Sequence, residues 1–109
     1  MPRVAFELQI REGKIAGYDE AHRQVWPELL AELTAFGVSD YSIFRRGHRL
    51  VLCMNVPDFQ VLVQQLAKSN VNLRWQETMA PLFAPVPGLL PGETYAMMEE
   101  VFFMPGNPA

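Results

Sequence analysis

The sequence predicts an α+β protein in which an antiparallel sheet carries helices on one of its faces. Three observations indicate this class: hydrophobic residues alternate over residues 3–10, a hydrophobic stripe at helical spacing follows, and two β-rich runs then flank a short turn. The chain has 109 residues and 50% of them are hydrophobic, which suits one domain with one core. We therefore expect a single domain over residues 1–105 and a flexible tail over residues 106–109.

The first strand and the first helical region are predicted from the spacing of their hydrophobic residues. The alternation over residues 3–10 is that of a half-buried strand, whereas residues 13–37 carry apolar side chains at the helical period. Pro27 lies inside this second stretch, and because proline suits the first turn of a helix, we expect a new helix to begin there. Gly37 is expected to cap the end of that helix.

A hairpin and two more helical segments are predicted in the middle of the chain. Residues 38–45 and 49–55 are apolar, β-rich runs on either side of a turn that contains Gly47, which is the pattern of a β-hairpin. Residues 57–67 then carry apolar side chains on one side of a predicted helix, and residues 71–79 form a further helical piece.

The last third of the chain is predicted to be a structured loop and a final strand. Residues 80–93 are rich in proline and glycine, and residues 95–103 read as a strand in which Glu99 and Glu100 would point to opposite faces. The resulting order, β-α-β-β-α-β, is the ferredoxin-like arrangement, with an antiparallel sheet and helices on one face. The other face would be bare in a single chain, so we expect a homodimer of the dimeric α+β barrel type.

The charge and the cysteine content narrow the possible partners and location. Nine basic and twelve acidic residues give a formal net charge of -3, which disfavours nucleic acid as a partner. Arg3 and Glu7 interrupt the N-terminal apolar stretch, so we expect no signal peptide, and the longest uncharged run, residues 78–92, is too short and proline-rich for a membrane helix. Cys53 is the single cysteine, which excludes an internal disulfide and a thiolate metal cluster, so we expect no metal and a cytoplasmic location.

Motifs of the common catalytic sites are absent from the sequence. It contains no glycine-rich nucleotide-binding motif, no P-loop, no H-E-x-x-H, no C-x-x-C and no G-x-S-x-G. With two histidines and one cysteine, the chain has few groups for metal binding or covalent catalysis. We therefore expect the function to be proton transfer or binding.

Tyr18 and His22 are the first candidates for a site. They are four residues apart, so they lie on one face of a helix, one turn apart. Spacing alone favours the simpler interpretation that both side chains cap the edge of the core. Histidine is nevertheless the side chain whose ordinary pKa, about 6.5, allows it both to donate and to accept a proton near neutral pH.

Other aromatic and polar residues extend this candidate site. Tyr41 lies in the second predicted strand, where a half-buried tyrosine usually joins the core and leaves its hydroxyl at the rim. Trp75 lies on the last predicted helix with Arg74 and Gln76 beside it, and an indole face with polar groups around it suits a sugar.

These residues belong to a longer pattern that resembles the L-rhamnose mutarotase family, and the resemblance extends from Phe6 to Pro105. The pattern consists of Tyr18-x-x-x-His22 followed by Trp26-Pro27-Glu28, then Tyr41-Ser42-Ile43, Arg74-Trp75 and Glu100-Val101-Phe102. The resemblance implies a dimeric ferredoxin-like protein, an isomerase of rhamnose metabolism that interconverts sugar anomers without a cofactor. It also implies that His22 is the proton donor and that Tyr18, Tyr41 and Trp75 contact the monosaccharide.

Two departures from the family pattern fall in the substrate-binding region. Family members commonly carry a second tryptophan directly after Arg-Trp, where this chain has Gln76, and an Asn- and Pro-rich loop where it has residues 85–91. Gln76 is therefore expected to contact the sugar, and L-fucose stands beside L-rhamnose as a candidate substrate. The base for the anomeric hydroxyl is left open between a water molecule and Glu100.

Two other functions use the same fold. One is a sugar-binding or regulatory module without catalysis, in which Gln76 reflects a lost activity. The other is a cofactor-free oxygenase or haem-handling protein of the dimeric ferredoxin-like type, with His22 as base or ligand. Such sites favour apolar walls for aromatic substrates, whereas Tyr18, Tyr41 and Gln76 favour recognition of hydroxyl groups.

Overall fold

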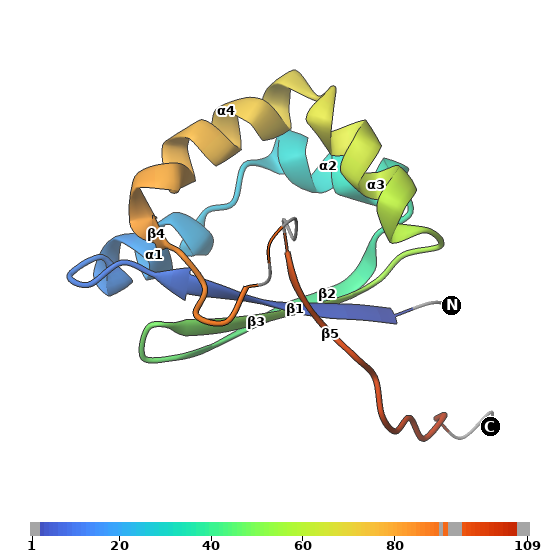
Figure 1. Cartoon of the computed structure of the whole chain (residues 1–109). Helices are drawn as coiled ribbons and strands as arrows, with labels where there is room; N and C mark the ends of the chain where they lie inside the picture. Colours follow the sequence, from blue (N-terminus) through green and yellow to red (C-terminus); the bar gives the residue numbers. More distant parts are fainter. Residues whose placement is uncertain (1–2, 90, 92–94, 107–109) are drawn as a thin grey trace.

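The protein is an antiparallel sheet with four helices arched over one face, as Figure 1 shows for the computed structural model. The structure describes residues 3–89, 91 and 95–106. The α+β class and the arrangement of helices on one face are therefore confirmed. None of the helices in these ranges has both the length and the apolar character needed to cross a membrane.

Three long strands and two short ones form the sheet. They are β1 (Arg3–Ile10), β2 (Ser39–Arg46), β3 (Arg49–Asn55), β4 (Phe83–Ala84) and β5 (Ala96–Met98). β1 pairs with β3 along one edge, and β3 pairs with β2 as the predicted hairpin. The other edge of β1 is shared, because β4 pairs with Gln9 and Ile10 while β5 pairs with residues 5–7. All pairs are antiparallel, so β4 and β5 together take the place of the last strand of a ferredoxin-like sheet.

The helices follow the predicted pattern closely. They are α1 (Ile15–Arg23), α2 (Pro27–Ala35), α3 (Phe59–Ala67) and α4 (Asn70–Met79), followed by the 3-10 turn η1 (Ala80–Leu82). Pro27 is the first residue of α2, which confirms the predicted break. Gly37 adopts a φ of 94°, a conformation that suits glycine, and the Val38 N–H donates to the Leu33 carbonyl at 2.9 Å, which closes the end of α2.

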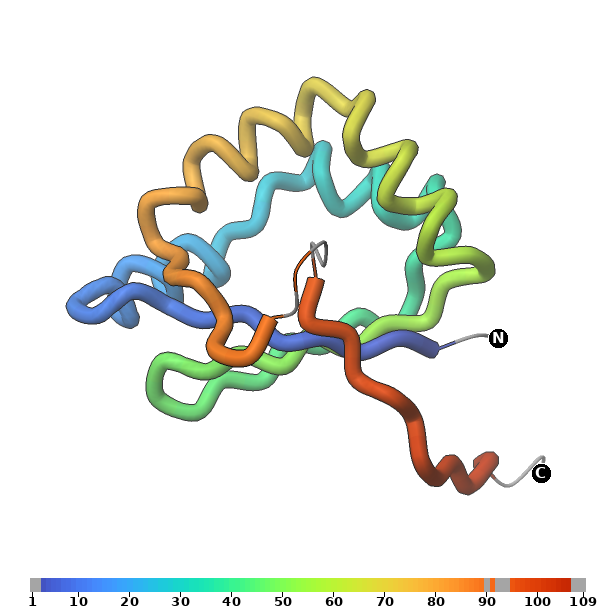
Figure 2. The backbone as a smooth tube through the Cα atoms, in the orientation of Figure 1, coloured from blue at the N-terminus to red at the C-terminus, as the bar shows by residue number. Residues whose placement is uncertain are grey.

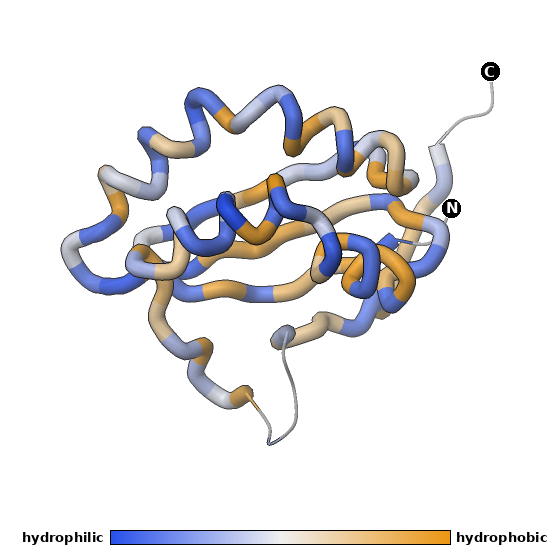
Figure 3. The backbone as a smooth tube through the Cα atoms, turned by 90° about the horizontal axis from the view of Figure 1, so that it is seen from above, coloured by the Kyte–Doolittle hydropathy of each residue, from blue (hydrophilic) through white to orange (hydrophobic). Residues whose placement is uncertain are grey.

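The core lies between the inner face of the sheet and the helices. Alternate residues of β1 and β3 point toward the helices, as the pairing of Phe6 with Leu52 illustrates. The largest fully buried side chains are Ile10, Leu50, Val56, Leu62 and Met79. Figure 3 shows the corresponding alternation of hydrophobic and hydrophilic residues along strands and helices. This layer fixes the helices that carry the site.

The predicted last strand over residues 95–103 is mostly wrong. Only Ala96–Met98 are a strand, and from Glu99 onward the described chain leaves the sheet and runs away from it, as Figure 2 shows. The reason is the length of β1. Met98 pairs with Ala5, so two residues of β1 remain beyond that point, and residues 101–103 of the predicted strand would have no neighbour on β1.

The prediction that Glu99 and Glu100 face opposite sides of the sheet is also wrong. Both lie beyond β5, and both border a hollow on the outer face of the sheet, the face without helices. Glu100 forms an ion pair with Arg3 at 3.2 Å, and the Arg3 guanidinium lies 4.0 Å from the centre of the Phe103 ring. These contacts hold the beginning of the C-terminal segment against β1.

Two predictions fall partly outside the described residues. The loop predicted over residues 80–93 contains η1 and β4, whereas positions 90 and 92–94 lie outside the described ranges. Of the tail predicted over residues 106–109, the structure describes Gly106 alone. The single domain over residues 1–105 stays a prediction.

Candidate active site

A cavity of about 430 Å³ lies between the inner face of the sheet and the helices. Its walls are mostly apolar, and the polar side chains that line it are few: Tyr18, His22, Tyr41, Asn72, Gln76 and Tyr95. All five residues predicted for the site therefore line one cavity, since Trp75 also belongs to its wall. A cavity of this size with a few polar groups on apolar walls is typical of a small-molecule site.

His22 is held by its own helix so that one ring nitrogen remains available. Its Nδ1 lies 3.0 Å from the backbone carbonyl oxygen of Tyr18, one turn earlier in α1. Because a carbonyl oxygen only accepts hydrogen bonds, Nδ1 must carry the hydrogen. In the neutral ring this leaves Nε2 without a hydrogen and able to accept a proton.

Two aromatic rings contact the His22 ring. It stacks on the Tyr18 ring, with 4.1 Å between centroids and 24° between planes. It also meets the Trp75 ring edge-on, with 5.6 Å between centroids. Trp75 in turn packs edge-on against Trp26 at 5.1 Å, so the Trp-Pro turn before α2 supports the wall from behind. The imidazole is thus oriented by packing as well as by its hydrogen bond.

Tyr18 and Tyr41 supply hydroxyl groups that stay protonated. Burial, with a smaller contribution from the Asp19 carboxylate, raises the pKa of Tyr18 to about 12. Burial raises the pKa of Tyr41 further, and the neighbouring Tyr18 and Tyr95 hydroxyls add to the effect. Tyr41 is 38% exposed as a whole residue, and with Tyr18 and Tyr95 it is one of three tyrosines that line the cavity. At neutral pH these hydroxyls can donate hydrogen bonds to a ligand.

Helix α4 contributes an amide pair beside Trp75. The Asn72 Nδ2 donates to the Leu66 carbonyl at 3.2 Å, and the Gln76 Nε2 lies 3.5 Å from the Asn72 Oδ1. Gln76 lines the cavity and is also exposed, so it lies at the opening. Arg74 points elsewhere, since it approaches Glu28 of α2 at 3.9 Å and does not line the cavity.

The structure corrects one suggestion and adds two residues. Glu100 lies on the outer face of the sheet with Arg3, so it is not the base for a group bound in the cavity. Asn72 and Tyr95 line the cavity although the sequence did not single them out. The four-residue spacing of Asn72 and Gln76 on one helix was the available signal. No comparable signal pointed to Tyr95, which the pairing of β5 brings beside Phe6, with 5.1 Å between ring centroids.

These features define the class of the protein: a small ferredoxin-like α+β protein with one imidazole and three tyrosines in the wall of a cavity of small-molecule size. Comparisons with known proteins identify the family. The sequence profile of the L-rhamnose mutarotase family matches residues 3–104. The chain belongs to the L-rhamnose mutarotase family, and it is accordingly an isomerase that acts on carbohydrates.

Relatives with known names agree with this assignment. The chain is 32% identical over 108 residues to the L-rhamnose mutarotase of Acidiphilium cryptum, covering 96% of this chain and 100% of the relative. It is 31% identical over 109 residues to the L-fucose mutarotase of Xanthomonas campestris, covering 94% of this chain and 87% of the relative. The crystal structure of the L-rhamnose mutarotase from Formosa agariphila superposes with a TM-score of 0.78 at 32% identity, covering 96% of this chain and all of that one.

The raised pKa of Tyr18 predicts how stability depends on pH. The folded pKa of about 12 lies above the ordinary value of about 10, so the folded state holds the proton more tightly than the unfolded state. This contribution is complete below pH about 10 and is lost as the pH rises toward the folded pKa. The free energy of unfolding should therefore fall by up to about 1.4 kcal/mol per pH unit for each such tyrosine.

Urea unfolding of the wild-type protein and of Tyr18→Phe, measured at several pH values above 9 (roughly the onset of tyrosine ionisation), checks this prediction. The variant has no ionisable hydroxyl at this position, so its stability should fall less steeply with pH. Equal slopes for the two proteins would show that Tyr18 is not buried in the manner described.

Proposed function

We propose that the protein interconverts the α and β anomers of a 6-deoxy aldose, L-rhamnose or L-fucose, with His22 transferring the proton. The observation that carries the proposal is the orientation of His22. Its Nδ1 is hydrogen-bonded to the Tyr18 carbonyl oxygen, and the ring lies in the wall of a cavity that tyrosines also line. A base that is free at one nitrogen and fixed at the other is suited to proton transfer with a bound sugar.

The chemistry requires one proton to change place. The Nε2 of His22 takes the proton of the anomeric hydroxyl, the bond from the anomeric carbon to the ring oxygen breaks, and the aldehyde forms. The imidazolium then returns the proton to the ring oxygen. Both oxygens are bonded to the same carbon in the closed ring, so a single nitrogen can serve both. After the carbonyl group has rotated, the reverse steps close the ring as the other anomer.

The other groups of the cavity would bind and orient the sugar. Tyr18 and Tyr41 remain protonated and can donate hydrogen bonds to ring or hydroxyl oxygens. Trp75 and the apolar walls suit the C–H face of the sugar and its methyl group. Tyr95 and Gln76 add further polar contacts. The two sugars come from the names of the relatives, since both L-rhamnose and L-fucose mutarotases match the chain.

The assignment of His22 is tested by two substitutions. His22→Ala should leave the fold intact and lower the rate of anomer exchange by roughly 10²–10⁴-fold, the range of general acid–base catalysis. His22→Gln keeps a hydrogen-bonding group without a transferable proton, so it should retain sugar binding better than rate. Magnetisation-exchange NMR on L-rhamnose, L-fucose and common D-sugars measures the rate, and thermal unfolding of each variant is the control.

Two results would contradict this role. A stable His22→Ala protein with undiminished exchange would falsify it, and a large loss of melting temperature in parallel with activity would indicate a core histidine instead. A wild-type protein that binds the sugars but leaves their exchange rate unchanged would support the non-catalytic binding module.

Gln76 is proposed to set the preference among 6-deoxy sugars. An amide at the cavity opening can bond a hydroxyl that an indole would only cover, and it leaves more room beside Trp75. Gln76→Trp should therefore change the ratio of exchange rates for L-rhamnose and L-fucose. Asn70, the first residue of α4, does not line the cavity, so Asn70→Gln is a control that should keep the wild-type ratio. An unchanged ratio in Gln76→Trp would remove Gln76 from the substrate contacts.

We also propose that the protein is a homodimer in which a second copy covers the outer face of the sheet. Phe44 on this face is 63% exposed, and the segment that follows β5 exposes 90% of Val101, 80% of Phe102 and 74% of Met104. Monomeric proteins rarely leave so much contiguous apolar surface in water, and a two-fold pair would bury it on both chains.

The unpaired Cys53 borders the hollow on the same face, and a free thiol suits the cytoplasm, where we place the protein.

Light scattering at micromolar concentration tests the dimer. The wild-type protein should have twice the chain mass of 12.4 kDa. Phe102 is mostly exposed, so Phe102→Glu should not disturb the core, and it should shift the mass toward that of one chain. The mass of a single chain for the wild-type protein would refute the proposal.

A further inference from the structure

The helix that carries His22 is weakly anchored by its own sequence. α1 has nine residues, of which Tyr18 is the one that is buried. It has no side-chain hydrogen bond at its N-terminal cap and no acidic residue in its first turn. Helices shorter than about 12 residues are marginal on their own, so tertiary contacts must determine where this helix lies.

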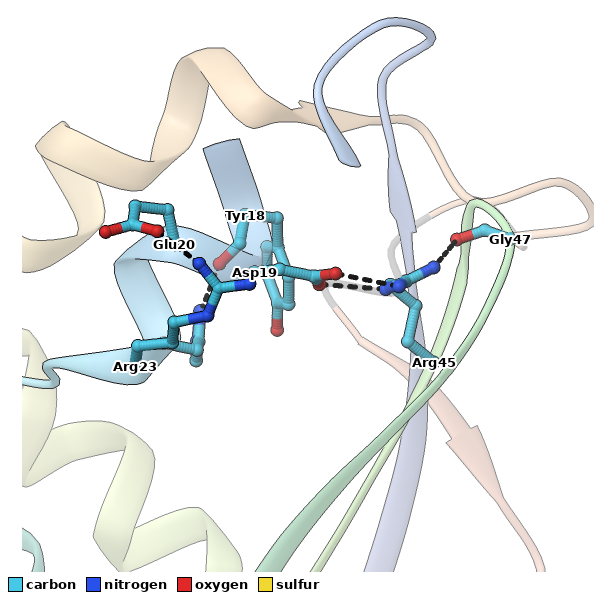
Figure 4. Close-up of polar contacts among 7 residues, drawn as sticks. Tyr18, Asp19, Glu20, Arg23, Arg45 and Gly47 are labelled. Atoms are coloured by element: carbon cyan, nitrogen blue, oxygen red, sulfur yellow. Dashed lines mark hydrogen bonds and ion pairs between the residues drawn. The ribbon is translucent and has the colours of Figure 1, made fainter. Parts of the chain in front are cut away.

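One such contact is an ion pair between α1 and the sheet. Asp19 accepts two hydrogen bonds from the Arg45 guanidinium of β2, one from Nε at 2.8 Å and one from Nη2 at 2.7 Å. Arg45 also donates from Nη1 to the Gly47 carbonyl at 3.2 Å, which holds the guanidinium toward the hairpin turn. Figure 4 shows this forked contact beside Tyr18. A two-point contact fixes direction as well as distance.

The ion pair connects the two sides of the cavity. Asp19 follows Tyr18 directly, and His22 lies one turn further along α1. Arg45 lies four residues after Tyr41 in β2, so the two side chains share the inner face of the strand. Neither Asp19 nor Arg45 lines the cavity. The pair is thus outside the site but joins the element that carries His22 to the element that carries Tyr41.

We infer that Asp19 and Arg45 are positioning residues of the active site, which hold α1 at the height above β2 at which His22 and Tyr41 act on one sugar. This inference rests on the proposed function. Both side chains are about one-third exposed, at 35% and 33%, and ion pairs of this exposure contribute little to stability. Their geometry matters more, since a displacement of about 1 Å can reduce a catalysed rate by roughly 10²-fold.

The test separates position from charge. Asp19→Asn raises the net charge by one and Arg45→Gln lowers it by one, so an electrostatic effect on the reaction would have opposite signs in the two variants. A positioning effect has the same sign in both. We expect kcat for anomer exchange to fall by roughly 10- to 100-fold in each variant, with a much smaller change in KM. Asp19→Glu, which keeps the charge and the forked acceptor, should recover part of the rate.

Glu20→Gln is the matched control. Glu20 is the next residue of α1, it pairs with Arg23 of the same helix, and its side chain is 70% exposed. The substitution removes one carboxylate from the same helix without touching the contact with β2, so kcat should stay at the wild-type value. Melting temperatures are measured for every variant.

Each outcome decides between the alternatives. Equal losses in Asp19→Asn and Glu20→Gln, opposite effects in Asp19→Asn and Arg45→Gln, or losses that only follow the melting temperature would overturn the inference. Wild-type protein that exchanges no sugar would refute the proposed function instead. In that case the inference can still be tested without activity, by the NMR signals of the His22 imidazole. The His22 signals should move in the same direction in Asp19→Asn and Arg45→Gln, and stay at their wild-type positions in Glu20→Gln; unmoved His22 signals would also overturn the inference.

Discussion

The pairing of β1 on both of its edges is the constraint on which the rest of the structure depends. One edge is taken by β3 over residues 3–9, and the other is divided between β4 and β5. Alternate residues of β1, among them Phe6 and Leu8, form the floor of the cavity, whereas their neighbours Ala5 and Glu7 belong to the outer face. Because side chains alternate with a period of two, a slip of one residue would exchange the two faces. The register of β1 therefore determines both the site and the apolar surface behind it.

The cavity combines polar groups with walls that do not solvate them. A polar group without a partner in such surroundings is costly, yet among the described residues every buried side-chain nitrogen or oxygen has a hydrogen-bond partner. Three residues that line the cavity keep polar groups available to a ligand: His22, whose Nδ1 alone is bonded to Tyr18, and Tyr18 and Tyr41, whose pKa values burial raises. The same apolar walls keep the hydroxyls protonated and make a hydroxylated ligand the natural partner for them.

Local rules predicted much of the fold, and their failures have a physical reason. The alternation of hydrophobic residues predicted the three long strands, and the missing N–H of Pro27 predicted the helix break. Both features depend on neighbouring residues alone. The last strand was predicted too long because its length depends on where β1 ends. In the site, spacing placed Tyr18 and His22 on one face, whereas Trp75 was suggested by its indole face beside polar residues and by the family resemblance. Tyr95 could not be found, since only the pairing of β5 brings it into the cavity.

The break at Pro27 divides the helical region before β2 into two helices, and residues of both line the cavity. It separates α1, which buries Tyr18, from α2, whose Leu29 is anchored in the core, so the two helices need not share one axis. The position of α1 then depends on the burial of Tyr18, on the Asp19–Arg45 pair in the middle of the helix, and on the Trp26–Trp75 packing after it. The Asp19–Arg45 pair is about one-third exposed, so it can change without opening a cavity in the core, where substitutions cost about 2–5 kcal/mol. The placement of the helix that carries His22 is therefore adjustable through this partly exposed pair, while the sheet and its core keep the fold.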